Sequence, residues 1–343
     1  MPTRCLACGG DAWAASYDVP ETMYGTGDVH RYCECSTCGS LTLSEAVSDS
    51  GELYPDDYYS LTADPMDSIG SPLARLAVRA LVRSALLGSG RVNRTAARRA
   101  PRREVRTLAS ILESIRASDV DWRDRPRVLD VGCGSGSLVY ALSLGTAAYC
   151  VGVDPFGRSR TFPSGAQTRQ CGLDDVQQGG WDLVMLHHSL EHVADPVATL
   201  SAARAALRPG GRVIVRMPTV TSDAWFEYRT EWAQLDAPRH SCVMSRTGVE
   251  AAVRRAGLAV VATRDDSTGF QFWGSEQIRL GIALEDSRSL LHAHRSDLFD
   301  RRTLGRWESS ARSLNRRNRG DQSCWILVPV PDRGTEADEG DVR

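Results

Sequence analysis

The sequence predicts an α/β protein with a doubly wound, mostly parallel sheet of seven strands, preceded by a small N-terminal zinc-ribbon module and a helical linker. From residue 125 onward, apolar segments of strand length alternate with segments of helical periodicity, a pattern typical of parallel sheets with crossover helices. Near the N-terminus, two Cys-x-x-Cys-Gly motifs have the spacing of a four-cysteine metal site. A chain of 343 residues is long for one domain, so a core domain with additions is expected.

Motifs and composition divide the chain into four parts. These are a zinc-binding module at 1–45, a linker with two helices at 46–124, the α/β core at 125–331 and a disordered acidic tail at 332–343. The core carries insertions at 219–243 and 268–321. They are expected to cover the substrate side, because open α/β sheets bind ligands past the carboxyl ends of their strands.

The two cysteine motifs comprise Cys5 with Cys8 and Cys35 with Cys38. Each motif places two thiolates on a tight turn, and two such turns form a tetrahedral four-sulfur site that leaves no open position. In an intracellular protein this spacing favours structural zinc over disulfides, and iron or a redox role is the alternative. Cys33 is the competing ligand. The remaining cysteines are expected in the core: Cys133, Cys150, Cys171, Cys242 and Cys324.

Two amphipathic helices are predicted in the linker, at 71–87 and 102–117. Their apolar faces comprise Leu73, Leu76, Ala77, Ala80 and Leu81 in the first helix and Val105, Leu108, Ile111, Leu112 and Ile115 in the second. A run of arginines from Arg91 to Arg106 is either a solvated surface or a phosphate-binding patch. The aromatic and acidic segment 54–59 is predicted to be a loop that either covers a bound ligand or packs on the sheet.

The most informative segment is the strand, turn and helix pattern at 128–142. An apolar strand ends in three glycines at alternate positions, Gly132, Gly134 and Gly136. A glycine turn allows the backbone to approach a ligand closely, and the following helix N-terminus points at the ligand's negative group. Ser137 stands where a dinucleotide fingerprint needs its third glycine, so the pattern does not favour a pyrophosphate ligand.

The segments after this helix continue the alternation. A second strand at 149–154 ends in Asp154, about 20 residues past the glycines, where a carboxylate can bind the ribose hydroxyls of a nucleoside. The further elements are a short strand with acids at its end at 169–175, a strand at 181–188, a helix at 195–207, a turn at 209–211, and strands at 212–217, 258–264 and 324–330.

The ordered segments between 127 and 218 resemble the class I S-adenosylmethionine-dependent methyltransferases. The matching residues are 129–136, Asp154, the Leu190-Glu191-His192-Val193 segment with Asp195-Pro196 after it, and 207–211. The resemblance implies a Rossmann-like core that binds S-adenosylmethionine. It also implies that the three glycines lie under the methionine end of the cofactor and that Asp130 binds its ammonium group. Asp154 then binds the ribose, Leu173 and Asp174 flank the adenine, and His187 belongs to the cofactor site.

The cysteine motifs ahead of such a core further resemble the zinc-binding methyltransferases of sugar and natural-product pathways. That group has a His-Glu-His-type segment after the fifth strand; here His240 matches the last histidine and Arg239 replaces the glutamate. Carbon methylation needs a base and stabilisation of an enolate, so the replacement favours an oxygen acceptor. We expect His240 to take the acceptor's proton and Arg239 to bind an anionic group on it. A competing base is His188, which clusters with His187, Glu191 and His192.

We therefore expect a cytoplasmic enzyme that methylates an oxygen of a sugar, glycan or natural-product intermediate. Aromatic residues of both insertions are expected to line the pocket for this small molecule: Trp225, Phe226, Tyr228, Trp232, Phe270, Phe272 and Trp273. The alternatives are a sugar C-methyltransferase, an RNA base methyltransferase, and a non-catalytic protein that binds the cofactor or acts as a scaffold.

Charge and hydropathy limit the partners. The formal net charge of −2 gives no support to a nucleic-acid partner. No apolar run approaches the ~18 residues of a membrane span, and no secretory signal opens the chain. The sequence contains no lysine, which excludes Schiff-base chemistry. It indicates no particular oligomeric state.

Overall fold

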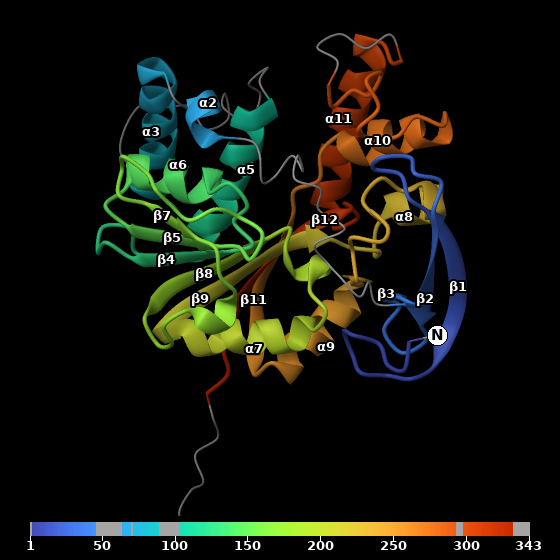
Figure 1. The fold of residues 1–343 in the computed structure, drawn as a ribbon, viewed down its shortest axis with the longest axis horizontal. Coiled ribbons are helices and arrows are strands. Elements are labelled where there is room, and N and C mark those ends of the chain that lie inside the picture. The colour runs from blue at the N-terminus through green and yellow to red at the C-terminus, as the bar shows by residue number, and fades with distance from the viewer. Residues whose placement is uncertain (1, 46–63, 70, 89–102, 293–297, 332–343) are drawn as a thin grey trace, which may run out of the picture.

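The computed structural model describes residues 2–45, 64–69, 71–88, 103–292 and 298–331, and contains two sheets. The larger sheet lies between two layers of helices, and the N-terminal strands stand beside one end of it (Figure 1). Within the described residues, no helix is both long and apolar enough to cross a membrane.

The larger sheet has eight strands in the order β11-β12-β9-β8-β4-β5-β7-β6. Their bounds are β4 Arg127–Val131, β5 Tyr149–Val153, β6 Arg160–Thr161, β7 Gln167–Arg169, β8 Trp181–His187, β9 Leu207–Pro218, β11 Leu258–Asp265 and β12 Gln322–Pro329. Neighbours from β9 to β7 pair in parallel, whereas β12 is antiparallel to both of its neighbours. The predicted doubly wound, mostly parallel sheet is confirmed, with the two-residue β6 added at its edge.

Strand β9 begins earlier than the sequence predicts. It starts at Leu207 and runs through Pro209-Gly210-Gly211, which the sequence indicates as a turn between helix and strand. The pairing explains the difference: Trp181 lies opposite Leu207, whereas Leu183 lies opposite Arg212. The extra residues form an irregularity inside the ladder, and the strand continues on both sides of it.

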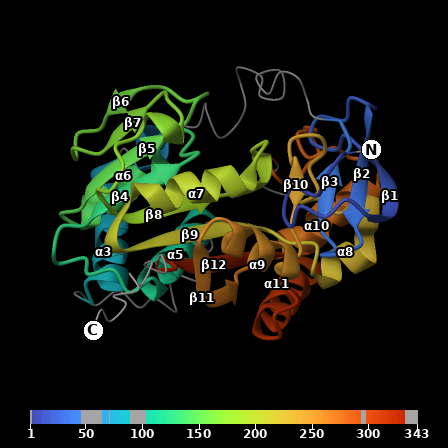
Figure 2. The same ribbon diagram turned by 90° about the horizontal axis from the view of Figure 1, so that it is seen from below.

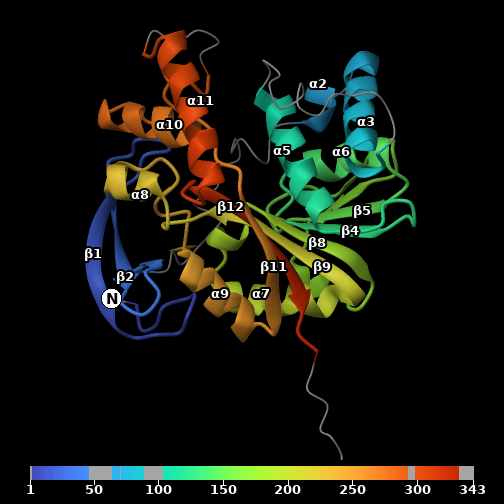
Figure 3. The ribbon, with the colours of Figure 1, turned by 180° about the vertical axis from the view of Figure 1, so that it is seen from behind.

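Helices cover both faces of this sheet (Figures 1 and 3). One layer comprises α2 Pro65–Ile69, α3 Pro72–Leu86, α5 Arg103–Ala117 and α6 Ser137–Gly145, and the other α7 Pro196–Ala206 and α9 Arg246–Arg255. The first layer buries Leu112 and Ile115 of α5 against Val128 and Leu183 of the sheet. The helices predicted as a linker are therefore packed parts of the layered core.

The predicted apolar face of α3 is wrong in its first half. Leu73 and Leu76 are 79% and 63% exposed, and the buried residues are Leu81, Val82, Ser84 and Ala85. Only the second half of α3 reaches α6, where a side chain at Gly145 would lie 2.4 Å from Val82. The predicted face of α5 is confirmed at Leu112 and Ile115. Segment 54–59 and the side chains of the arginine run at 91–106 lie outside the described residues.

The N-terminal sheet is completed by a strand from the core. It comprises β1 Trp13–Pro20, β2 Val29–Cys35, β3 Leu41–Leu43 and β10 Cys242–Val243, in that order. Strand β10 comes from the end of the first insertion and pairs antiparallel with β3 (Figure 2). The module and the core therefore share one sheet, which the sequence does not predict.

The aromatic residues of the first insertion pack into the N-terminal module. The insertion forms α8 Asp223–Tyr228 and a 3₁₀ turn at Arg229–Glu231. Trp225, Tyr228 and Trp232 are buried with residues of β1, β2 and β3, such as Val19 and Tyr32. The prediction that these three residues line a substrate pocket is therefore wrong. They provide the apolar surface against which the N-terminal sheet packs.

The second insertion separates β11 from β12, as the sequence predicts. It contains α10 Phe270–Arg279 and α11 Arg301–Arg316. Both helices rise beside the N-terminal strands and α8 (Figures 1 and 3). Aromatic contacts hold the two helices together, since the rings of Phe272 and Trp307 stack with centroids 6.4 Å apart.

Candidate active site

A cavity of about 1590 Å³ lies at the carboxyl ends of β4, β5 and β8. The N-terminal module and both insertions contribute to its walls, through residues such as Met23, Leu43, Gln234, Pro238, Phe270 and Trp273. A site for one small molecule usually has about 300–1,000 Å³. The cavity is therefore large enough for two ligands side by side.

The glycine turn forms one wall of this cavity. Gly132, Gly134 and Gly136 have φ values of +73°, +52° and +85°, a left-handed region that favours glycine. A side chain at Gly132 would lie 2.5 Å from Ser189 Cβ, and one at Gly136 would lie 2.4 Å from Thr168 Cγ2. Helix α6 begins directly afterwards without a side-chain cap. The N–H groups of the three glycines are donated within the protein, so it is the first turn of α6 that presents backbone N–H groups where a ligand can approach closely.

Asp154 holds this turn in place. Its Oδ2 accepts a hydrogen bond from Gly134 N at 2.9 Å, and its Oδ1 accepts from Phe156 N and Gly157 N. The side chain is 8% exposed and lines the cavity. Since each carboxylate oxygen has two lone pairs, the group can stabilise the turn and still accept a hydrogen bond from a ligand hydroxyl.

Asp130, on β4, is buried without a partner for one oxygen. The residue is 3% exposed, and its Oδ1 has no hydrogen-bond partner among the described residues. Burial, followed by the charge of Asp154, raises the pKa of Asp130 to about 7. A buried carboxylate in this state fits a ligand that brings a positive charge.

The cavity wall that contains the glycine turn continues in the residues after β7. Leu173 and Asp174 lie in the 3₁₀ turn Leu173–Asp175 and line the cavity, with Leu173 buried and Asp174 exposed. Phe156 also lines it and is 40% exposed. Phe156 is not among the site residues predicted from the sequence, although its position two residues after the strand-end acid places it at the sheet edge.

His187 and His188 follow one another at the end of β8 but have different surroundings. Neither ring nitrogen of His187 has a hydrogen-bond partner among the described residues. Burial, with a smaller effect from Arg216, lowers the pKa of His187 to about 3. His188 has φ +52° and remains partly exposed, with Nδ1 3.2 Å from Glu191 Oε1. Because a carboxylate only accepts, His188 Nδ1 is the donor.

His188 and His240 belong to one group, which we call the histidine cluster (His188, Glu191, His192 and His240). The rings of His192 and His240 lie edge to face with centroids 4.6 Å apart. His240 Nδ1 lies 3.0 Å from Gln234 O, and His192 Nδ1 lies 3.0 Å from Arg239 O. Carbonyl oxygens only accept, so both rings carry their proton on Nδ1. Burial, followed by the effect of His192, lowers the pKa of His240 to about 4.

Arg239 does not line the cavity, and its predicted contact with a substrate anion is wrong. The side chain is 3% exposed, and Nη2 lies 2.6 Å from Glu21 Oε1 and 2.7 Å from Asp236 Oδ1. Glu21 also accepts hydrogen bonds from backbone N–H groups of residues 23–26. The guanidinium is therefore occupied by two buried carboxylates and connects the catalytic insertion to the N-terminal module.

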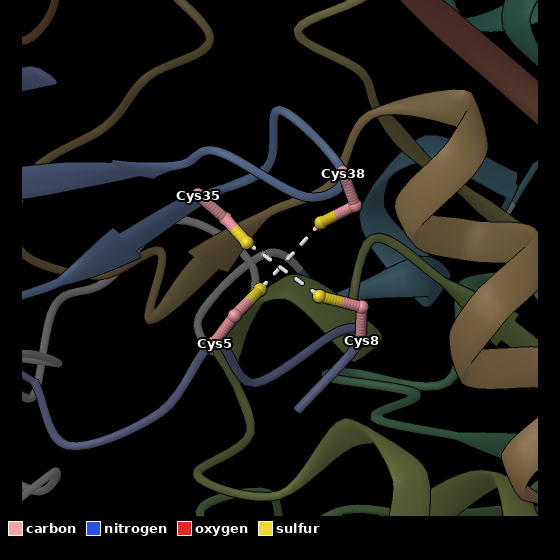
Figure 4. Close-up of side chains that lie close together, drawn as sticks. All are labelled: Cys5, Cys8, Cys35 and Cys38. Carbon is pink, nitrogen blue, oxygen red and sulfur yellow. Dashed lines mark hydrogen bonds between the residues drawn. The ribbon is translucent and has the colours of Figure 1, made fainter. Parts of the chain in front are cut away.

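The four predicted cysteine ligands lie together at the N-terminal module (Figure 4). Cys5 Sγ lies 3.6 Å from Cys38 Sγ, and Cys8 Sγ lies 3.5 Å from Cys35 Sγ. All ten cysteines of the chain are free thiols. Cys33 is outside the group and contacts Ser44 Oγ. Of the cysteines expected in the core, Cys150, Cys242 and Cys324 are buried, whereas Cys133 and Cys171 are half-buried.

Comparison with known proteins identifies the core. Residues 93–263 match the family model described as "Methyltransferase domain". Residues 93–263 therefore carry a methyltransferase domain, in agreement with the resemblance to class I S-adenosylmethionine-dependent methyltransferases. The match confirms the predicted kind of core and supports S-adenosylmethionine as its cofactor.

Two curated relatives are similar over part of the methyltransferase. A "Ubiquinone biosynthesis O-methyltransferase" of Xanthomonas axonopodis is 34% identical over 117 residues, which are 30% of this chain and 49% of that protein. A "tRNA U34 carboxymethyltransferase" of Dichelobacter nodosus is 35% identical over 112 residues, 30% of this chain and 36% of that protein. The chain spans about half or less of the length of these relatives.

Two solved structures are similar to part of the chain. One is a geranyl diphosphate C-methyltransferase from Streptomyces coelicolor, with 17% identity, a TM-score of 0.40, and 70% of this chain and 91% of that chain covered. Another is an S-adenosylmethionine-dependent methyltransferase from Mesorhizobium loti, with 16% identity, a TM-score of 0.40, and 66% and 98% covered.

Proposed function

We propose that this methyltransferase transfers the methyl group of S-adenosylmethionine to an oxygen of a small-molecule acceptor bound at the histidine cluster. The observation that carries the proposal is that one cavity is lined both by the glycine turn with Asp130 and by His240 of the cluster. A sulfonium methyl group held at the first place can meet a nucleophile held at the second, so positioning and exclusion of water provide much of the rate.

The residues around the glycine turn fit the cofactor. The backbone of Gly132, Gly134 and Gly136 would lie under its methionine end, and the unpartnered Asp130 carboxylate would bind its ammonium group. Asp154 would accept a hydrogen bond from a ribose hydroxyl through the remaining lone pair of Oδ2. Leu173 and Asp174 would flank the adenine, with Phe156 beside them. When bound, the cofactor supplies an electrophilic methyl group.

His240 is suited to accept the proton of a hydroxyl acceptor. Its Nδ1–H is donated to Gln234 O, so the lone pair of Nε2 is the basic one. Because burial lowers the pKa of His240 to about 4, the ring is neutral at neutral pH and can accept a proton, and it is a weaker base than an unperturbed histidine. His188 is hydrogen-bonded to Glu191 and partly exposed, so it can pass the proton to water.

The charges around the cavity favour oxygen over carbon as the acceptor atom. Carbon methylation next to a carbonyl requires a group that stabilises an enolate. The two buried arginines beside the cavity are already paired, Arg216 with Asp266 and Arg239 with Glu21 and Asp236. A sugar C-methylation is therefore the weaker proposal.

We infer that the four-cysteine group binds structural zinc. Zn–S bonds of about 2.3 Å place thiolate pairs about 3.8 Å apart in a tetrahedron, close to the observed separations of 3.6 and 3.5 Å. The contact between the two thiols lowers the pKa of Cys5 to about 5 and raises the pKa of Cys38, as expected when two thiols share one proton in the absence of a metal. Four cysteine ligands leave no position for a substrate.

The acceptor is proposed to be a sugar, glycan or natural-product intermediate. Phe270 and Trp273 offer apolar surface in the cavity, and Gln234 and Ser241 offer polar groups, a combination typical of pockets for small, partly polar molecules. An RNA acceptor would need a basic surface, and the net charge of −2 does not favour one.

Formation of S-adenosylhomocysteine tests this function. The purified protein is incubated with S-adenosylmethionine and a panel of sugars, phenols and RNA, and methylated acceptors are identified by mass spectrometry. We expect a methylated hydroxyl of a small molecule. Methylation of RNA alone would overturn the acceptor class, and cofactor binding without turnover of any acceptor would favour the non-catalytic alternative.

Single-turnover measurements test the role of His240. With saturating cofactor, His240→Ala should slow the chemical step by roughly 10²–10⁴-fold without weakening cofactor binding. His30→Ala, on β2 and outside the cavity, is the matched control. An unchanged chemical step in His240→Ala would exclude this residue from the proposed role.

A further inference from the structure

We propose that Glu191, His192 and His240 form a binding site for a divalent metal ion at the acceptor end of the cavity, separate from the four-cysteine site. One candidate ligand atom from each residue lies within 4.8 Å of the other two. Zinc bonds of about 2.0–2.2 Å to nitrogen and oxygen place ligand atoms about 3–4 Å apart. Small side-chain rotations are therefore enough to bring the three ligands onto one ion.

The orientation of the two histidines supports this site. Metal-binding histidines usually donate the N–H of their second ring nitrogen to a carbonyl or carboxylate, which directs the other nitrogen to the metal. His240 Nδ1 donates to Gln234 O and His192 Nδ1 donates to Arg239 O, both at 3.0 Å. Both rings are thus held in the tautomer that offers Nε2 as the ligand.

Glu191 provides the second, independent observation. Its side chain is fully buried, and while Oε1 receives the hydrogen bond from His188, Oε2 has no hydrogen-bond partner among the described residues. Leaving such an oxygen unpaired costs about 1–3 kcal/mol or more when it is charged. A cation bound to Oε2 would offset this cost.

Other charges near the site also favour a cation. Asp236 Oδ2 lies 3.9 Å from His240 Nε2, which adds a second carboxylate beside the three ligands. One cation, Arg239, pairs with both Asp236 and Glu21. Glu191, Asp236 and Glu21 together therefore leave an excess of carboxylate charge beside the two imidazoles.

The ligand set indicates which ion would bind and what it would do. Two histidines and one glutamate are typical of catalytic zinc, and two histidines and one carboxylate are typical of ferrous sites, with further positions open to a ligand. His192 and His240 line the cavity, so those positions face the acceptor. An ion there would lower the pKa of the acceptor hydroxyl.

This role, though not the binding itself, rests on the proposed function. An ion on His240 Nε2 occupies the lone pair that would otherwise take the acceptor proton, so in the metal-bound protein His240 is a ligand and no longer the base. The acceptor proton then leaves through His188 to water. The oxygen then forms the new C–O bond as the C–S bond of the sulfonium breaks, and the neutral thioether departs.

Metal content of the untagged 343-residue protein tests the site directly. After loading with zinc and dialysis, elemental analysis should find two ions per chain, one in each site. The variants Glu191→Gln and His240→Ala should each retain one ion, and their affinity for the second ion should be more than tenfold weaker. The control variant His292→Ala, which removes another imidazole of the same cavity, should retain two ions. Calorimetric binding of S-adenosylmethionine checks that each variant is folded.

Cobalt substitution in the wild type gives a test that needs no variant. Cobalt at four cysteines shows thiolate-to-metal charge-transfer absorption, whereas cobalt on nitrogen and oxygen ligands does not. Two cobalt ions with only one thiolate spectrum would support the second site. One ion per chain, or a second ion that survives Glu191→Gln, would overturn it. Turnover by protein with a single ion would overturn the ion's role and leave the proposed function intact.

Discussion

Asp130 offers the sharpest test of the cofactor site, because its burial affects both stability and binding. In the cofactor-free protein, burial raises the pKa of Asp130 from 3.8 to about 7. The folded protein therefore binds this proton more tightly than the unfolded chain, and stability should fall as the pH rises from about 4 to 7. At 1.36 kcal/mol per pKa unit, the ionised side chain costs at most about 4 kcal/mol at pH 8.

Asp130→Asn removes this charge and should stabilise the cofactor-free protein at pH 8. Denaturant unfolding of wild type and variant at several pH values between 5 and 8 measures the difference. The gap in unfolding free energy should widen by about 1.4 kcal/mol per pH unit up to pH 7 and then level off. Asp174→Asn, which changes an exposed carboxylate of the same cavity, serves as the control.

Binding of the cofactor should release the same proton. At pH 6 most Asp130 side chains are protonated, and pairing with the ammonium group of the cofactor favours the carboxylate. Calorimetry in buffers with different ionisation enthalpies should therefore detect nearly one proton released in the wild type and none in Asp130→Asn. A constant gap in stability across this pH range, or equal proton release by both proteins, would refute the reasoning.

Three further predictions concern other parts of the site. Asp154→Ala should weaken S-adenosylmethionine binding by about 1–3 kcal/mol in calorimetry, because ribose hydroxyls would lose their partner; equal affinity would exclude Asp154. Arg239→Ala should lower the unfolding free energy by about 3–5 kcal/mol, because it leaves Glu21 and Asp236 buried and unpaired; unchanged stability with a raised acceptor KM would restore its role as an anion-binding residue. Cys8→Ser should release the thiolate-bound metal and reduce acceptor methylation while cofactor binding persists; elemental analysis that still finds this metal would contradict its assignment.

The geometry of the glycine turn and of Asp154, which form the proposed cofactor half of the site, could be predicted from the sequence because these residues follow one another locally. The turn from Gly132 to Gly136 needs positive φ values that glycine favours, and Asp154 follows the next strand. The alternation of apolar segments likewise determined the order of strands and helices. Such features depend on residues within a few positions of one another.

The acceptor half could not be predicted, because it depends on contacts between distant segments. His240 meets the residues that follow β8 only after the first insertion folds back onto them, as its contact with His192 shows. The sequence therefore presents His240 and His188 as rival candidates for the base. Arg239 pairs with Glu21, 218 residues away, which converts an expected anion-binding residue into an internal connection. The positive φ of His188 has no local signal either, since glycine usually occupies that region.

The pairing of β10 with β3 of the N-terminal sheet affects how the protein folds during translation and how it can be engineered. Ser245 Oγ donates to Cys38 O across 207 residues of chain, next to a cysteine motif translated long before. A ribosome must therefore produce most of the core before the module at the N-terminus can close. Residues 1–45 and the segment around His240 form one structural unit. A chimaera designed to transfer the acceptor specificity to another protein would therefore need both segments.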